Sequence, residues 1–336
     1  MDWKDKTLLI TGGTGSFGKK FTKTALAEKQ PKKIIIFSRD ELKQHEMKMH
    51  GYDHPSLRYF IGDVRDRERL IRAMHGVDIV VHAAALKQVP ACEYNPMEAI
   101  KTNIMGTANV VEAALDAGVQ KVMTISTDKA VSPANLYGAT KLAAEKLTIQ
   151  SNAYAAGTKT RYSCVRYGNV VGSRGSVVPL FLKQRSSGAV TITDDRMTRF
   201  WLSLDQGVRF VMNCIEQMEG GEVFVPKIPS TKVIDLANAI VPDAKVNIIG
   251  IRPGEKLHED LISHDEARHT IELDKMYVIQ PAEASWFGYS WKNKGQSLPE
   301  GYHYSSDTNT QWLDINGIRE FVAPFEQLFA EGKLEG

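Results

Sequence analysis

The feature of this sequence that most restricts its fold is a regular alternation of short β-branched runs and longer amphipathic segments across its first half. We read the apolar runs as strands because they are rich in Val and Ile, and the segments between them as helices because of their helical periodicity. Strands that alternate with helices in this way are typical of a parallel sheet with helices on both faces. The sequence therefore predicts an α/β protein with a doubly wound parallel sheet. The expected strands lie at 7–11, 32–38, 57–63, 77–85, 119–127 and 160–172.

The second half of the chain is less regular and sets the predicted domain organisation. A chain of 336 residues is long enough for about two domains. We place the boundary between residues 172 and 173, with the alternating pattern in 1–172 and a looser mixture of helices, turns and short strands in 173–336. One apolar run beyond the boundary, at 222–228, is a candidate to rejoin the main sheet.

Composition narrows the class of protein. Lys and Arg number 42 and Asp and Glu number 40, so a formal net charge of +2 gives no reason to expect a nucleic-acid partner. The sequence has no run of about 18 apolar residues, which argues against a membrane span. Cys92, Cys164 and Cys214 lie far apart without a CxxC pair, which indicates a reducing compartment and a cytoplasmic protein. No cluster of His, Cys and Asp has metal-ligand spacing, so we expect no metal.

A glycine-rich turn follows the first expected strand and opens a helix. Its sequence, TGGTGSFG, places Gly12, Gly15 and Gly18 in a GxxGxxG spacing. Glycine lets the chain turn tightly and approach a pyrophosphate, which the N–H groups at the start of the helix can then bind. The turn, including Ser16 and Phe17, is therefore the predicted dinucleotide site. The alternative is an ordinary glycine-rich turn.

The end of the second expected strand bears on which dinucleotide binds. An acidic residue here would pair with a ribose hydroxyl of NAD, whereas a nearby Arg would accommodate the 2′-phosphate of NADP. The chain has Ser38 and Arg39 at this point, with Asp40 next and Lys43 one turn on. We favour NADP because of the two cations, while Asp40 keeps NAD open; a solvated helix start is the plain alternative. Asp63, which ends the third strand, could bond the adenine amine or simply cap the next helix.

Residues 127–141 hold a candidate catalytic group. Tyr137 and Lys141 are four apart, so on a helix they share a face, and the ammonium would favour the phenolate form of the Tyr. Tyr137 is thus a plausible base toward a substrate hydroxyl, and Thr127 could bond the same oxygen. Asp128 and Lys129 are adjacent and of opposite charge, so each can shift the pKa of the other. The alternatives are a surface helix pair and an Asp that only caps a helix.

Taken together, these motifs resemble the extended short-chain dehydrogenase/reductase superfamily. The resemblance rests on the glycine turn, on HAAA at 82–85, and on Thr127, Tyr137 and Lys141. Related retaining dehydratases usually carry Met at the position of Tyr137, so this Tyr indicates the inverting branch of the UDP-N-acetylglucosamine 4,6-dehydratases. The segments similar to that group include FSRDELKQ, IGDVRDRERL, HAAALKQVP, STDKA, NLYGATKL, RYGNVVGSRGSVVP, MTRFW and RPGEKLHE.

The resemblance implies a Rossmann-like NADP-binding domain in 1–172 and a smaller substrate-binding domain with an irregular C-terminal region in 173–336. It implies that UDP-N-acetylglucosamine becomes a 4-keto-6-deoxy sugar nucleotide with C5 inverted, while NADP carries the hydride internally. This reaction would be the first step of pseudaminic acid biosynthesis, which serves flagellin glycosylation. The resemblance also implies a homo-oligomer, such as a hexamer.

Individual residues receive roles from the same resemblance. Thr127, Tyr137 and Lys141 would serve the oxidation at C4. Lys129 would move the C5 proton and Asp128 would protonate the leaving C6 hydroxyl, although the sequence does not fix which of the two is acid and which is base. Further cofactor contacts are expected at Val64, Ala83, Ala84, Lys87 and Asn103. Expected substrate contacts are Lys87, Asn169, Arg174, Val178, Arg199, Arg252 and Glu255.

Other functions stay open at this point. A nucleotide-sugar 4-epimerase of the same superfamily would need Tyr137 and Lys141 but no acid and base for C5, so Asp128 and Lys129 argue against it. A retaining 4,6-dehydratase is a second alternative. The third is a non-catalytic NADP-binding module, against which the intact set of Thr127, Tyr137 and Lys141 argues.

Overall fold

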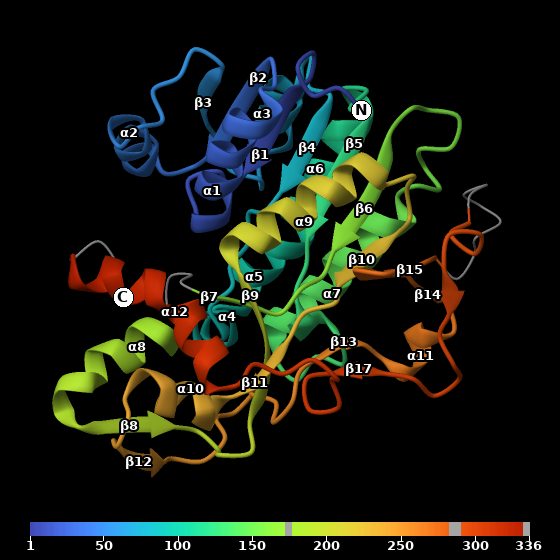
Figure 1. The fold of residues 1–336 in the computed structure, drawn as a ribbon. Helices are drawn as coiled ribbons and strands as arrows, with labels where there is room; N and C mark the ends of the chain where they lie inside the picture. The colour runs from blue at the N-terminus through green and yellow to red at the C-terminus, as the bar shows by residue number, and fades with distance from the viewer. Residues whose placement is uncertain (172–176, 282–289, 332–336) are drawn as a thin grey trace.

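A ten-stranded sheet forms the centre of the protein (Figure 1). The structure, a computed structural model, describes residues 1–171, 177–281 and 290–331. The strand order is β16-β14-β15-β10-β6-β5-β4-β1-β2-β3. The strands from β3 to β10 are parallel, and β15, β14 and β16 continue the sheet in antiparallel fashion. In chain order they are β1 (Thr7–Thr11), β2 (Lys33–Ser38), β3 (Leu57–Ile61), β4 (Ile79–His82), β5 (Lys121–Ile125), β6 (Arg161–Val165), β10 (Val223–Pro226), β14 (Thr270–Glu272), β15 (Met276–Ile279) and β16 (Gln296–Ser297).

This order confirms the predicted doubly wound sheet. The chain runs outward from β1 to β2 and β3, then crosses to β4 on the other side of β1. Loops part at this switch point, which is where sheets of this kind bind ligands. The run at 222–228 does rejoin the main sheet, because β10 pairs in parallel with β6. The division between residues 172 and 173 stays a prediction, since strands from both sides of it share one sheet.

β1 has the bounds of the run at 7–11, but the other predicted strands of the main sheet are shorter than their apolar runs. The run at 77–85 yields only Ile79–His82, and the run at 119–127 yields Lys121–Ile125, so the residues that follow form loops at the edge of the sheet. The run at 160–172 divides into β6 and β7 (Asn169–Val171), and β7 belongs to a separate sheet. Gly168 lies at the break and packs closely on Phe200, because a Cβ there would be 2.6 Å from the Phe200 Cβ.

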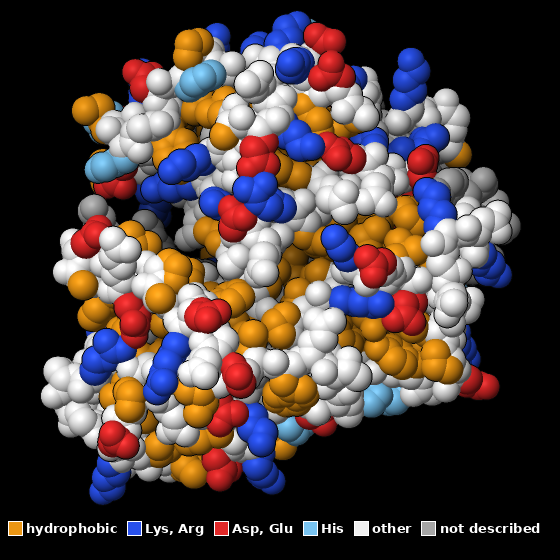
Figure 2. Space-filling view, in the orientation of Figure 1, with side chains coloured by type: hydrophobic (Ala, Val, Ile, Leu, Met, Phe, Trp, Pro, Cys, Tyr) orange, Lys and Arg blue, Asp and Glu red, His pale blue; other side chains and the backbone are white. Residues whose placement is uncertain are grey.

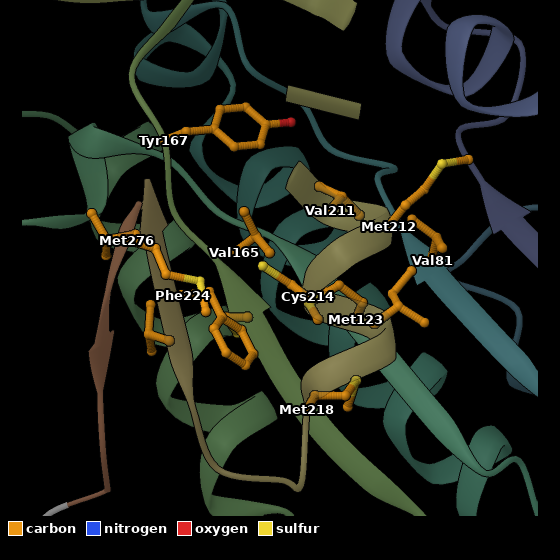
Figure 3. Packing of buried hydrophobic residues seen from close by; sticks show 14 of the residues in the cluster. Val81, Met123, Val165, Tyr167, Val211, Met212, Cys214, Met218, Phe224 and Met276 are labelled. Carbon is orange, nitrogen blue, oxygen red and sulfur yellow. The ribbon is translucent and has the colours of Figure 1, made fainter. Parts of the chain in front are cut away.

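Helices cover both faces of the sheet. Side chains alternate between the faces, so Leu8 and Ile10 of β1 join one core and Leu9 joins the other. Figure 3 shows the first core, where Val211 and Met212 of α9 pack over strands of the sheet. Burial of these apolar side chains stabilises the arrangement. Helices α1 (Ser16–Thr24) and α9 (Leu204–Gln217) lie on that face, and α3 (Arg67–Met74), α6 (Gly106–Asp116) and α7 (Leu136–Gln150) on the other.

A smaller lobe with its own apolar core is built from the C-terminal half (Figure 1, lower left). It consists of α8 (Val177–Gln184), β8 (Ala189–Ile192), α10 (Val233–Ile240), β12 (Lys245–Ile248) and α12 (Ile315–Ala330). The small sheet β11-β9-β7 lies between this lobe and the main sheet, and the pair β13-β17 lies below β10 and β15 in Figure 1. The remaining elements are η1 (Ala25–Lys29), α2 (Glu41–Met49), α4 (Val89–Tyr94), α5 (Pro96–Ala99), η2 (Ile100–Met105), η3 (Asp128–Ala130), η4 (Arg185–Ser187), β9 (Thr198–Ser203), β11 (Ser230–Lys232), β13 (Asp260–Ile262), α11 (His264–Ala267) and β17 (Tyr304–Ser305).

The surface carries charges of both signs. On the face shown in Figure 2, Lys and Arg side chains are interspersed with Asp and Glu. This mixture agrees with the formal net charge of +2. Within the described ranges, no helix has the length and apolar character needed to cross a bilayer.

Candidate active site

A cavity of about 610 Å³ opens at the carboxyl edge of the parallel strands. Its walls come from the loops that follow β1 to β5, from α7, and from β7 and β9. The sheet therefore gathers residues that are far apart in the sequence into one site. The predicted site residues that line the cavity are Gly12, Gly15, Ser16, Phe17, Ser38, Arg39, Lys43, Asp63, Val64, Ala83, Ala84, Lys87, Thr127, Asp128, Lys129, Tyr137, Lys141 and Asn169.

The glycine turn after β1 has a shape that side chains would obstruct. Gly12 has a φ of +65°, and a Cβ there would lie 2.9 Å from the backbone N of Ala84. Gly18 does not line the cavity, but a Cβ at this position would lie 2.5 Å from the Cα of Gly13, so Gly18 lets α1 pack against the turn. Gly15 is the N-cap residue of α1 and borders the cavity. The unpaired N–H groups at the start of α1 are thus available to an anion there.

The tip of β2 presents a cation to the cavity rather than a carboxylate. Arg39 lines the cavity, and its guanidinium is 3.7 Å from the carboxylate of Asp63. Asp40 does not line the cavity, because it caps α2 by accepting a 3.0 Å hydrogen bond from the backbone N of Lys43. The Lys43 ammonium lies 2.7 Å from the other oxygen of Asp40, and these hydrogen bonds from Lys43 lower the pKa of Asp40. A ribose bound at this edge of the cavity could therefore contact Arg39, whereas Asp40 lies outside the cavity wall.

A neutral histidine fixes the loop after β4. The ring of His82 lies between the hydroxyl groups of Thr11, at 2.7 Å, and Thr107, at 3.0 Å. Burial, helped by the charge of Lys141, lowers the pKa of His82 to about 3, so the ring is uncharged at neutral pH. The Thr11 hydroxyl also accepts the backbone N–H of Ala84 at 3.2 Å. This network holds the small residues of the loop beside the glycine turn.

Asn103 supports the cavity wall without lining it. Its amide bonds both the backbone N and the backbone O of Leu86 at 2.8 Å, and it is only 1% exposed. Asn103 thus holds the segment that precedes Lys87, and the expected cofactor contact at Asn103 stays a prediction. Lys87 does line the cavity, and burial lowers the pKa of its ammonium.

The candidate dehydration group lies on the turn η3. The Thr127 hydroxyl donates a 2.8 Å hydrogen bond to Oδ1 of Asp128. The Lys129 ammonium lies 3.0 Å from the same Oδ1 and 3.2 Å from Oε1 of Glu259. Burial alone would lower the pKa of Lys129, but the carboxylates of Asp128 and Glu259 raise it. Lys129 is accordingly cationic at neutral pH.

Tyr137 and Lys141 enter the same cavity from the first turns of α7. Burial raises the pKa of Tyr137 to about 12, while the charge of Lys129 and a hydrogen bond with Thr127 act to lower it. The cation that favours the phenolate is thus Lys129, whereas the sequence indicated Lys141. The reason is geometric, because the Lys141 ammonium donates a 2.7 Å hydrogen bond to the carbonyl of Ile125 at the end of β5. Burial lowers the pKa of Lys141.

The predicted substrate residues lie in different settings. Asn169 lines the cavity, and its buried Oδ1 has no hydrogen-bond partner. Arg199 does not line the cavity, because its guanidinium donates to the backbone carbonyls of Thr198, Lys256 and Leu257 at 2.7 to 3.0 Å. These bonds hold the 256–257 segment, and the role of Arg199 in binding the diphosphate stays a prediction.

Other expected substrate contacts lie outside the cavity wall. Arg252 and Glu255 face each other at 3.9 Å on the loop before β13, and Arg252 is exposed. Val178 is fully buried in the core of the smaller lobe. Arg174 lies outside the described residues. The roles of these residues in substrate binding stay predictions.

Sequence reasoning missed several residues of the site. Trp201, Tyr167 and Ser126 line the cavity, and Glu259 contacts Lys129. Trp201 and Glu259 end the segments MTRFW and RPGEKLHE, so the quoted motifs contained the signal without singling them out. Within the described ranges, the buried polar side-chain atoms that lack a hydrogen-bond partner are Thr102 Oγ1, Ser126 Oγ, Asp128 Oδ2, Asn169 Oδ1, Trp201 Nε1 and Glu259 Oε2.

Most of these unpaired atoms belong to residues that line the cavity. Burying a polar atom without a partner is costly, so such atoms mark where a ligand would bond. The site can therefore take a polar ligand along the side formed by η3, β7 and β9.

Two contacts dock the loop before β13 on the loop before α7. The amide of Asn135 donates a 2.8 Å hydrogen bond to the carbonyl of Gly254, where φ is +80°. The Lys256 ammonium donates a 2.6 Å hydrogen bond to the carbonyl of Val131. The loop between η3 and α7 is thus tied to the segment of the C-terminal half that leads to Glu259.

Comparison with known proteins agrees with this architecture. Residues 8–281 match the family described as "Polysaccharide biosynthesis protein". The chain is 54% identical over 325 residues to UDP-N-acetylglucosamine 4,6-dehydratase (inverting) of Campylobacter jejuni, covering 94% of this chain and 97% of that protein. It is also 42% identical over 342 residues to UDP-glucose 4-epimerase of Rickettsia conorii, covering 98% of each chain.

Solved structures show the same fold. Pen from Bacillus thuringiensis superposes with a TM-score of 0.89 at 38% identity, covering 97% of this chain and 99% of that one. DesIV, a dTDP-glucose 4,6-dehydratase from Streptomyces venezuelae, superposes with a TM-score of 0.68 at 24% identity, over 75% of this chain and 86% of that one. The fold and the site thus define an extended short-chain dehydrogenase/reductase. Within that class, the chain belongs to the polysaccharide biosynthesis protein family and has inverting 4,6-dehydratases among its relatives.

Proposed function

We propose that this protein is a UDP-N-acetylglucosamine 4,6-dehydratase that inverts C5 and uses NADP as an internal hydride carrier. The observation that carries the proposal is the meeting of Tyr137, Asp128 and Lys129 in the cavity that the glycine turn also borders. Oxidation at C4 alone needs only Tyr137, together with Lys141. Elimination needs an acid and a base in addition, and Asp128 and Lys129 are in contact at 3.0 Å.

The residues present fit a dinucleotide. Gly12, Gly15 and the start of α1 would hold the pyrophosphate, because they leave room for it and offer free N–H groups. Arg39 would read the 2′-phosphate of NADP, since it lines the cavity and Asp40 does not. When bound, the cofactor would accept hydride from C4 and return it to C6. The relatives support a nicotinamide cofactor, as DesIV was solved with NAD bound.

Tyr137 is the proposed base for the O4 proton. Because burial raises its pKa to about 12, Tyr137 is a phenol in the free site. Its pKa must fall before it accepts a proton, and the cation of this chain placed to lower that pKa is Lys129. Thr127 lines the cavity beside them and can bond the same substrate oxygen.

A proton balance follows from the contact between Asp128 and Lys129. Transfer of the Lys129 proton to Asp128 leaves an amine that can remove the proton from C5 and an acid that can protonate the leaving C6 hydroxyl. After water has left, Lys129 is again an ammonium and Asp128 a carboxylate. Inversion requires the new C5 proton to come from a group other than Lys129. Tyr137, which holds the O4 proton, is the proposed donor, and a Met at this position could not serve.

The proposed substrate places its sugar near η3 and its nucleotide toward the second half of the chain. Asn169 and Lys87 line the cavity and would contact the diphosphate and sugar. Arg174, Val178, Arg199, Arg252 and Glu255 are proposed on resemblance to complete the site. The pathway step, pseudaminic acid biosynthesis, and a homo-oligomer such as a hexamer rest on the same basis. The described cysteines are all free thiols, which supports a cytoplasmic location.

The second candidate is a 4-epimerase, favoured by the Rickettsia relatives that are 42% identical over 98% of this chain. The test is to incubate the protein with UDP-N-acetylglucosamine and NADP in deuterium oxide and to analyse the product by NMR and mass spectrometry. Dehydration predicts deuterium at C5, loss of the 6-hydroxyl and an inverted C5. A 4-epimer that retains hydrogen at C5 would overturn the proposal. Deuterium with retained C5 configuration would identify a retaining dehydratase, and absence of any turnover would favour a binding module.

A further inference from the structure

Glu259 is a buried carboxylate in direct contact with the proposed C5 base. Its side chain lies just before β13 and is 3% exposed. Oε1 is 3.2 Å from the Lys129 ammonium, whose other partner, Oδ1 of Asp128, is 3.0 Å away. The two carboxylates therefore hold one ammonium between them, from segments that are far apart in the sequence.

The backbone of Glu259 is fixed from the C-terminal segment. Its N–H donates a 2.9 Å hydrogen bond to the hydroxyl of Ser306, and its carbonyl accepts a 2.9 Å hydrogen bond from the backbone N of Ser306. The Ser306 hydroxyl in turn lies 2.7 Å from that of Thr198 on β9. A carboxylate held this firmly can set the position of the flexible lysine side chain that it pairs with.

Glu259 and Lys129 lie among other charged and titratable side chains. The charged and titratable groups that face this pair are Asp128 and Lys129 of η3, Arg199 of β9 and Tyr137 of α7. Burial raises the pKa of Glu259, as does the charge of Asp128, whereas Lys129 and Arg199 lower it. Oε2 of Glu259 has no hydrogen-bond partner, so its attachment to the site runs through Lys129.

We propose that Glu259 is a positioning residue that holds Lys129 at the reacting carbon throughout elimination; the inference rests on the proposed dehydratase function. When the Lys129 proton passes to Asp128, the ion pair between these two residues is lost. Glu259 still accepts a hydrogen bond from the amine at that moment, so the nitrogen stays in place. The ammonium that forms after C5 deprotonation regains a buried charge partner at once, because an unpaired buried charge would be costly.

The test compares Glu259→Gln and Glu259→Asp with the unaltered protein, using NADP and UDP-N-acetylglucosamine. Glu259→Gln keeps the shape and removes the charge. It should lower kcat for water loss by at least about tenfold, because the Lys129 nitrogen loses the charged partner that holds it at the reacting carbon. It should also move the alkaline limb of the kcat/KM profile to lower pH by about one unit, because Lys129 loses an anionic neighbour. Glu259→Asp should keep the alkaline limb of the unaltered protein.

Asp260→Asn is the matched control, because Asp260 is the next residue, pairs with Lys256 at 3.4 Å and does not line the cavity. It should leave both kcat and the alkaline limb unchanged. If the unaltered protein dehydrates the substrate and Glu259→Gln matches it in rate and in pH profile, the inference is wrong. A loss of rate without a shift of the limb, together with a lower melting temperature, would also overturn it in favour of a structural role. If the unaltered protein performs no dehydration, the proposed function fails first.

Discussion

Gly138 lies directly against the backbone of Lys129: a Cβ at position 138 would be 2.1 Å from the Lys129 carbonyl oxygen. Gly138 is in the first turn of α7, next to Tyr137, and Lys129 is on η3. The absence of a side chain at 138 lets the helix and the turn approach closely enough for Tyr137 and Lys129 to share one cavity. The position of Tyr137, the proposed base for oxidation, relative to Lys129, the proposed base for elimination, therefore depends on Gly138.

Gly138→Ala is expected to separate these two groups. The clash is with backbone, which cannot rotate away, so the substitution should lower the free energy of unfolding by about 1–3 kcal/mol, as overpacking does. Product formation should fall even under conditions where the variant stays folded, because η3, which carries Asp128 and Lys129, must shift to make room for the new methyl group. Urea unfolding and product formation under the same conditions would measure the two effects.

The control for this substitution is Gly207→Ala in helix α9. A Cβ at 207 would meet only the end of the Leu202 side chain, at 3.4 Å. Replacing a helical glycine in such a setting should leave activity intact and stabilise the protein by up to about 1 kcal/mol. Equal behaviour of the two alanine variants would contradict the importance of the Gly138 contact.

Arg39→Ala is expected to weaken NADP more than NAD. Arg39 lines the cavity, whereas Asp40 is engaged as a helix cap, so the guanidinium is the group that would bond the 2′-phosphate. Loss of such a charge-assisted contact should reduce NADP affinity by about tenfold or more while changing NAD affinity little. Isothermal titration with each dinucleotide measures this. Lys48→Ala, which removes an exposed cation of α2 outside the cavity wall, is the control, and equal weakening of both dinucleotides by Arg39→Ala would refute the assignment.

The parts of the site that could be predicted from the sequence are those encoded by short local patterns. The glycine turn, with Gly12 and Gly15, is marked by spacing within a few residues, and its place after β1 follows from the strand pattern. Tyr137 and Lys141 are likewise set by helical periodicity. The doubly wound sheet was predictable for the same reason. Each strand and each helix shows its own spacing of apolar residues within a short stretch of sequence, and the alternation of the two predicts the sheet.

Contacts between distant segments could not be read in this way. The guanidinium of Arg199 donates hydrogen bonds to the carbonyls of Lys256 and Leu257, which lie far from it in the sequence. Glu259 reaches Lys129 only because the loop before β13 docks beside η3. Neither contact can be predicted from a regular spacing of residues, since each depends on how two distant segments pack together.

Lys129→Ala is expected to abolish water loss while leaving NADP bound. The variant removes the proposed C5 base, so dehydration should fall by about 10²–10⁴-fold, the usual contribution of a general base. The glycine turn and Arg39 are untouched, and NADP affinity should stay within about twofold of its value in the unaltered protein. Mass spectrometry of the sugar product and titration with NADP provide the two readouts. Lys146→Ala, which removes an exposed lysine of α7, is the control, and a Lys129→Ala protein that dehydrates normally would show the assignment to be wrong.

Glu266→Gln is expected to produce a pH-dependent loss of stability. Arg166 is fully buried between the carboxylates of Glu145 and Glu266, and it joins α7 and α11 to the end of β6. Burial alone would raise the pKa of Glu266, but the Arg166 guanidinium lowers it from 4.5 to about 2. A carboxyl group whose pKa is lower in the folded state stabilises the protein above its unfolded pKa. That stability is lost as the pH falls toward the folded value.

The expected difference in free energy of unfolding between Glu266→Gln and the unaltered protein is about 3 kcal/mol at pH 7, from a shift of roughly two units or more and the loss of a buried partner. It should shrink as the pH falls from about 4.5 toward 2, because the native carboxylate is then neutralised as well. Urea unfolding at several pH values between these limits would follow the change. A difference that stayed constant with pH would mean that Glu266 acts through its shape rather than through its charge. Asp265→Asn is the matched control, since Asp265 is the preceding residue, is exposed and pairs only with the exposed Arg268 among the described ion pairs, and it should change stability little at any pH.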